Sequence, residues 1–221
     1  MDISRRKLLG WTAMAPLAAA ATAVAGITEK AAAGVGLGAT ASDRARQRIQ
    51  RMHFPNVHLY THEGKRVMFY DDLVKGKIVT MNFFFAKCDE ICPMVMANLS
   101  RVQDRVAADL NKRLFMYSLT LKPEEDTVDA IRQFREMHEA RPGWTFLTGK
   151  PQDLEKVRRG IGFSYPNPVV DKDKTQHIGN VRYGNEPLML WAACPGMAHA
   201  DFIAESVSWM LHPEQSHIQP S

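Results

Sequence analysis

The chain has 221 residues, of which 28 are basic and 24 acidic, so its formal net charge at pH 7 is only +4. Hydrophobic residues make up 45% of the sequence, which is enough to bury a real core. The sequence has no basic block interleaved with aromatic residues beyond the N-terminus, and this argues against nucleic acid as a partner. It has no internal repeat and no second long apolar run, which favours one soluble domain.

The N-terminus has the features of an export signal. Ser4-Arg5-Arg6-Lys7-Leu8-Leu9 precedes an alanine-rich, mildly apolar stretch over residues 10–25. This pattern predicts that residues 1–25 are a twin-arginine signal peptide and that the chain works in the periplasm. Cleavage is expected after Ala25, with Ala31-Ala32-Ala33 as a second candidate and an uncleaved signal that anchors the chain in the membrane as the alternative. Without residues 1–25 the chain has 25 basic and 23 acidic residues.

Composition divides the rest of the chain into three parts. Residues 26–51 are rich in alanine, glycine and charged residues and are expected to form a tether. Residues 52–211 are expected to form the folded domain, and residues 212–221 a polar tail.

Strands and helices are expected to alternate within the domain. Runs of β-forming residues and apolar residues at helical spacing predict the following elements. They are a hairpin of residues 57–60 and 65–70, a strand over 78–85, a helix over 93–110, a strand over 114–121, a helix capped by Asp126-Thr127, a strand over 144–147, a helix from Pro151, a hairpin of residues 178–183 and 188–193 that turns at Gly184-Asn185, and a helix over 201–210. This order predicts an α/β sandwich.

The first two cysteines lie where the central strand passes into a helix. Cys88 and Cys92 follow the strand over 78–85, and Pro93 suits the first turn of a helix. At a helix N-terminus the dipole favours negative charge, so lowered cysteine pKa values are expected. The three intervening residues exceed the two of the common dithiol redox motif, and soft thiolates select Cu(I). A metal site, a redox pair and an inert disulfide all remain open.

Cys194 is the odd third cysteine. It follows the last predicted strand in the segment Ala193-Cys194-Pro195-Gly196-Met197. The simplest interpretation is a small core residue, because free cysteine is among the most buried residue types. The alternative is a resolving thiol or an extra copper ligand beside Met197.

Several motifs together resemble those of the Sco/SenC family of copper proteins. They are Cys88-Asp89-Glu90-Ile91-Cys92-Pro93 after a strand, Phe54-Pro55-Asn56-Val57, Tyr70-Asp71-Asp72-Leu73-Val74-Lys75-Gly76-Lys77, the segment with Pro123 and Asp126-Thr127, and Gly143-Trp144-Thr145-Phe146-Leu147-Thr148-Gly149. The resemblance implies a thioredoxin-like sandwich with a central mixed sheet flanked by helices. It also implies that His177 joins Cys88 and Cys92 as a copper ligand, although Thr175-Gln176 stands where relatives often carry an acidic residue.

The resemblance implies a periplasmic copper metallochaperone that holds Cu(I), Cu(II) or both. Its client would be the CuA centre of cytochrome c oxidase subunit II or nitrous oxide reductase, and its partners could include a periplasmic copper donor or thiol reductant. The alternative is a thiol–disulfide oxidoreductase in which Cys88 attacks and Cys92 resolves. A peroxide-reducing role has little support, because no threonine or proline lies in the five residues before Cys88.

Overall fold

The computed structural model describes residues 40–88, 90–173 and 179–213, and its contacts divide the chain into one unit of residues 1–44 and another of residues 45–221. Helix α2 (Ala41–His53) begins in the first unit. There Thr40 Oγ1 accepts the main-chain N–H of Asp43 at 3.1 Å, and the Asp43 carboxylate accepts the N–H of Thr40 at 3.0 Å. This reciprocal capping box explains why a helix starts in a segment whose composition predicted a tether.

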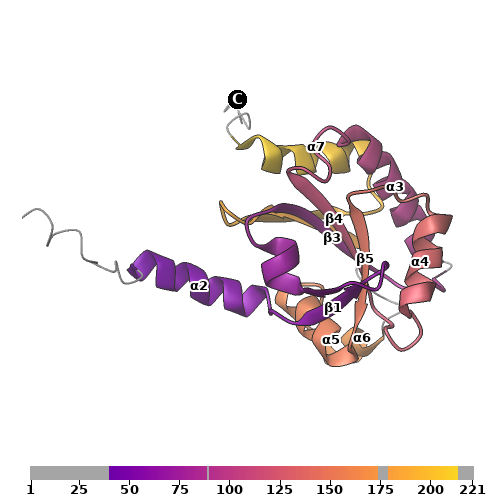
Figure 1. The fold of residues 1–221 in the computed structure, drawn as a ribbon, viewed down its shortest axis with the longest axis horizontal. Helices are drawn as coiled ribbons and strands as arrows, with labels where there is room; N and C mark the ends of the chain where they lie inside the picture. The colour runs from indigo at the N-terminus through magenta and orange to yellow at the C-terminus, as the bar shows by residue number, and fades with distance from the viewer. Residues whose placement is uncertain (1–39, 89, 174–178, 214–221) are drawn as a thin grey trace, which may run out of the picture. The chain divides into compact units, whose positions relative to one another are not determined.

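Within the described part of the second unit, seven strands form one mixed sheet in the order β2-β1-β5-β4-β3-β6-β7 (Figure 1). The strands β3, β4 and β5 are parallel to one another, and the outer pairings are antiparallel. The predicted central mixed sheet is confirmed. The bounds are β1 His58–Thr61, β2 Arg66–Met68, β3 Ile78–Phe84, β4 Leu114–Thr120, β5 Trp144–Gly149, β6 Asn180–Asn185 and β7 Leu190–Pro195.

Helices cover both faces of the sheet (Figure 1). Apolar residues of α3, α4 and α7 pack in one core cluster, and those of α5 and the π-helical segment η1 pack in a second cluster on the other face. Strand β3 lies between the clusters, and all seven of its residues are buried, as its apolar sequence predicts. The helices are η1 Phe69–Val74, α3 Cys92–Arg105, α4 Val128–Met137, α5 Pro151–Gly160, α6 Pro168–Lys172 and α7 Ala200–Leu211.

Two predicted boundaries are wrong. The last hairpin does not turn at Gly184-Asn185, because β6 continues through Asn185 and the turn falls at residues 186–189. Gly184 is needed inside the strand, since a Cβ there would lie 2.2 Å from an atom of the Trp191 ring. Helix α3 ends at Arg105 rather than near Leu110, which instead forms a β-bridge with Leu114.

No helix within residues 40–88, 90–173 and 179–213 is both long enough and apolar enough to cross a membrane. The predicted signal peptide, residues 1–25, lies outside the described residues.

Candidate metal centre

The cysteine pair lies at the carboxyl end of β3, in the loop that leads into α3. Cys92 is the first residue of α3 and Pro93 follows it in the first turn, as the sequence predicts. Cys92 is 1% exposed and Cys88 8%, and both pack in the core cluster beneath α3. All three cysteines are thiols, and none of them forms a disulfide within the described part of the chain. Cys88 is therefore the more accessible of two thiols that lie at the edge of the core.

The predicted lowering of the cysteine pKa is wrong for Cys92. Burial raises the pKa of the Cys92 thiol to about 12, and a hydrogen bond with the Cys88 thiol acts in the same direction. A hydrogen bond from the Phe85 main chain opposes the shift without cancelling it. Removal of the sulfur from water therefore outweighs its position at a helix N-terminus. With this pKa, Cys92 is a neutral thiol near pH 7.

A buried carboxylate, Asp126, fixes the loop that carries Cys88. The main-chain N–H of Ala86 lies 3.3 and 3.2 Å from its two carboxylate oxygens, and the Thr120 hydroxyl also donates to it. Thr148 Oγ1 donates to the Asp126 carbonyl at 2.8 Å. Asp126 is 2% exposed, and burial raises its pKa although the bonds from Thr120 and Ala86 act to lower it.

The sequence predicted that Asp126-Thr127 caps a helix, but the two residues have separate roles. Thr127 is the N-cap of α4, and its side chain accepts the N–H of Ala130 at 3.3 Å. Asp126 turns instead toward the cysteine loop. Its support of the site was missed because the partner, Ala86, is 40 residues away and contributes only a main-chain N–H.

The start of β6 lies at the same end of the sheet as the cysteine loop. β3 and β6 are antiparallel, with Ile78 opposite Asn185 and Met81 opposite Arg182. The same register carried three residues further places Phe84 opposite Gly179, so the end of β3 and the start of β6 share one edge. A Cβ on Gly179 would lie 2.9 Å from the Ile91 side chain, which directly precedes Cys92. The main chain at Gly179 therefore packs against the cysteine loop.

Helix α6, which precedes β6 in the chain, is held by a buried ion pair between Asp171 and Arg158. Both oxygens of Asp171 accept from Arg158, at 2.7 and 2.6 Å, and both side chains are about 5% exposed or less. Burial alone would lower the pKa of Arg158, but hydrogen bonds with Glu155 and Asp171 raise it instead. Tyr165 N donates to Asp171 at 2.9 Å. This network fixes α6, which ends just before residues 174–178.

Within residues 40–88, 90–173 and 179–213, no three metal-ligating side chains come together as a metal site. The two predicted thiol ligands are adjacent, and the predicted third ligand, His177, lies outside the described residues. Cys194 is 4% exposed in β7, and burial raises its pKa to about 11, which fits the interpretation as a core residue. The two described thiols are soft donors, which suit a soft cation such as Cu(I).

The fold and the cysteine pair define a thioredoxin-like protein with a dithiol at the carboxyl end of a central strand. The SCO1/SenC family model matches residues 47–188, which is more than half of the chain. The chain belongs to the SCO1/SenC family.

Individual relatives are distant. A curated protein of Stutzerimonas stutzeri whose name contains the words copper-binding protein is 24% identical over 115 residues, which are 51% of this chain and 55% of that protein. The chain spans 30% to 55% of the length of the curated relatives it matches.

Solved structures support the same fold. The copper-bound crystal structure of Arabidopsis thaliana ScoI has a TM-score of 0.59 at 20% identity, covering 73% of this chain and 99% of that one. BsSco, described as a member of the Sco family of cytochrome c oxidase assembly proteins with a disulfide switch, has a TM-score of 0.57 at 20% identity, covering 71% and 92% of the two chains.

Proposed function

We propose that this protein is a copper metallochaperone that binds one copper ion through Cys88, Cys92 and His177. The observation that carries the proposal is the shared sheet edge, where the cysteine loop after β3 lies against the start of β6. His177 is two residues before Gly179 in the sequence, and two residues of extended chain span about 7 Å at most. We infer that this short connection to Gly179 lets the His177 imidazole join the two thiols in binding copper.

The donor set suits copper. Two thiols and one imidazole are soft to intermediate ligands, which favour Cu(I) over harder ions, and Cu(II) could be held if an oxygen ligand joined them. The copper-bound and copper-named relatives support the same cation. Because both cysteines must be deprotonated, copper binding would release protons, and apparent affinity should rise with pH.

The client we propose is a respiratory copper enzyme, either cytochrome c oxidase at its CuA centre or nitrous oxide reductase. The cytochrome c oxidase assembly role stated for BsSco supports the first. Transfer would proceed by stepwise ligand exchange, in which a client side chain replaces Cys88 first because it is the more exposed thiol. We place this transfer in the periplasm, reached through the twin-arginine motif at Arg5-Arg6. Replacing Arg5 and Arg6 with lysine should block export, which fractionation of cells would detect.

Copper binding of the reduced protein tests the proposal. We expect one Cu(I) per chain in competition with a chromophoric chelator, and at least a tenfold loss of affinity in each of Cys88→Ala, Cys92→Ala and His177→Ala. Cys194→Ala and His58→Ala are matched controls, because Cys194 packs in the core and His58 is exposed on β1. Retention of affinity in His177→Ala would remove the proposed third ligand.

A thiol–disulfide reductase is the second candidate, favoured by the greater exposure of Cys88. Cys88 would attack a client disulfide, and Cys92 would then displace the mixed disulfide, leaving a Cys88–Cys92 disulfide that an external dithiol must reduce. The raised pKa of Cys92 slows the second step near pH 7. His177→Ala separates the candidates, since a reductase should keep its rate of disulfide reduction in this variant.

A further inference from the structure

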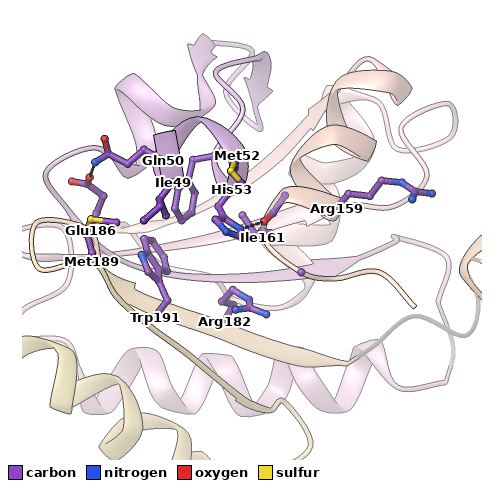
Figure 2. A pocket seen from close by; sticks show the side chains of 13 residues that line it. Ile49, Gln50, Met52, His53, Arg159, Ile161, Arg182, Glu186, Met189 and Trp191 are labelled. Carbon is purple, nitrogen blue, oxygen red and sulfur yellow. Dashed lines mark hydrogen bonds between the residues drawn. The ribbon is translucent and has the colours of Figure 1, made fainter. Parts of the chain in front are cut away.

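Figure 2 shows a cavity of about 450 Å³. It lies on the face of the sheet opposite the cysteines. Helix α2 and the end of α5 form its walls, and strands β6 and β7 contribute Arg182 and Trp191. Trp191 packs against the second core cluster, whereas all three cysteines belong to the first. The cavity is therefore separate from the proposed copper site. Its volume falls in the usual range for small-molecule pockets.

One cation in this cavity, the guanidinium of Arg182, has no counter-charge among the described residues. Within that part of the chain the Arg182 side chain forms no ion pair or hydrogen bond, and its buried Nε is without a partner. The guanidinium is held against the main chain of Gly162, where a Cβ would lie 2.7 Å from Nη2. Burial lowers the pKa of Arg182, as expected for a charge removed from water without compensation. A buried N–H donor without a partner costs free energy. A ligand that accepts a hydrogen bond from Arg182 would remove that cost.

The other charged groups that line the cavity are already paired. Glu186 accepts from Gly76 N at 2.7 Å, Tyr70 at 3.0 Å and Gln50 at 2.5 Å, and it pairs with Arg46 at 3.5 Å. Arg159 is mostly exposed and pairs with Glu155 and Asp171. Neither group compensates Arg182. The cavity thus offers one positive charge to a ligand.

The remaining wall is mainly apolar. The Trp191 ring lies 4.6 Å from that of Phe54, and Ile49 and Met52 of α2 are 45% and 63% exposed. Figure 2 shows the side chains of Ile49 and Trp191 beside this space, with Arg182 near Trp191 at its base. An apolar wall next to a single unpaired guanidinium complements a molecule with an apolar body and one anionic head.

We propose that this cavity binds a small amphipathic monocarboxylate, with the carboxylate on Arg182 and the apolar body between Trp191 and α2. The charge complementarity of Arg182 selects an anion, and the apolar wall selects an aliphatic or aromatic body over a sugar or a nucleotide. The site is independent of the proposed copper function.

Equilibrium dialysis of the full chain with octanoate tests this proposal, with 1-octanol as the uncharged probe of similar size. We expect saturable one-to-one binding of octanoate that is tighter than that of octanol. Arg182→Gln should weaken octanoate binding about tenfold or more, because it removes a charged hydrogen bond, and leave octanol binding unchanged. Unchanged octanol binding would also show that the cavity of the variant is intact.

Arg159→Gln is the matched control, since it removes a second arginine from the same cavity rim. It should change octanoate affinity by much less than Arg182→Gln. The proposal is overturned if wild-type protein binds no octanoate saturably, if octanol binds as tightly, or if the two arginine variants weaken octanoate equally. Copper stoichiometry should be the same in wild type and Arg182→Gln, which separates this test from that of the proposed function.

Discussion

Two buried aspartates, Asp171 in α6 and Asp126 beside the cysteine loop, fix their surroundings by different means. Asp171 accepts two hydrogen bonds from the guanidinium of Arg158 in front of residues 174–178. Asp126 fixes the cysteine loop through a main-chain N–H and a hydroxyl, and the described residues give it no ion pair. One anchor is charge-compensated, and the other is satisfied by neutral donors only.

The two anchors differ in the charge that they place near the thiols. A buried guanidinium beside Asp126 would also lie near the thiols and would favour their thiolate forms. Burial and the hydrogen bond with Cys88 are the larger causes of the raised pKa of Cys92, and the negative potential of Asp126 adds to them. Asp126, the anchor near the thiols, therefore helps to keep Cys92 protonated. Asp171 lies in another part of the fold and forms the stronger ion pair.

The largest loss of stability is expected when the ion pair of Asp171 with Arg158 is broken. Asp171→Asn removes the more deeply buried of the two carboxylates that pair with Arg158 and leaves Glu155 as the remaining counter-charge, and this should reduce the free energy of unfolding by about 3 kcal/mol. Urea denaturation measures the loss. Asp129→Asn, which breaks an exposed pair with Arg132, is the control and should cost no more than about 1 kcal/mol. Equal losses in the two variants would contradict the distinction between buried and exposed pairs.

A smaller effect is expected from the neutral anchor. Asp126→Asn keeps an oxygen that can accept the Ala86 N–H, so the loss near pH 7 should be about 1 kcal/mol. The same denaturation experiment measures it. If this variant lost as much stability as Asp171→Asn, the two anchors would not differ in the way proposed.

The pH dependence of stability should sharpen the comparison. The folded-state pKa of Asp126 is raised above its ordinary value of 3.8, so the folded protein binds this proton more readily than the unfolded chain. The resulting stabilisation is fully present below about pH 3.8 and is lost as pH rises through the folded-state pKa. Stability of the wild type relative to Asp126→Asn should therefore increase on acidification from pH 7. An unchanged difference in denaturation midpoints across this range would exclude a raised pKa.

The smallest effect is expected at the surface of the cysteine loop. Lys87 and Glu125 form an ion pair of 3.4 Å, but their side chains are 79% and 45% exposed. Lys87→Gln should change the free energy of unfolding by less than about 1 kcal/mol, because solvent screens the pair. Differential scanning calorimetry at low and moderate salt would detect any larger contribution.

Local patterns in the sequence predicted most of the elements but not their distant contacts. The apolar run of β3 and Pro93 after Cys92 placed the cysteines correctly, since strand and helix signals act over a few residues. The pKa of Cys92 depends mainly on burial and on the hydrogen bond with Cys88, and neither follows from position at a helix start. The turn at residues 186–189 depends on Trp191 packing over Gly184, a contact between strands.

His177 illustrates the same limit. Sequence resemblance pointed to it, but the residue pattern around it would not have distinguished it from seven other histidines. The physical reason to favour it comes from the antiparallel pairing of β3 with β6, which brings the start of β6 to the cysteine loop. Strand order is a non-local property, and no local pattern in this sequence specifies it.

The pairing of β3 with β6 also has a consequence for the lifetime of the protein. Cys92 and His177 are about 85 positions apart in the chain, so a copper ion held by both would bind the folded state far better than the unfolded chain. At a free copper concentration 100 times the dissociation constant, this linkage adds about 2.7 kcal/mol to the free energy of unfolding. Proteases that cleave unfolded chains would then remove empty molecules in preference to loaded ones.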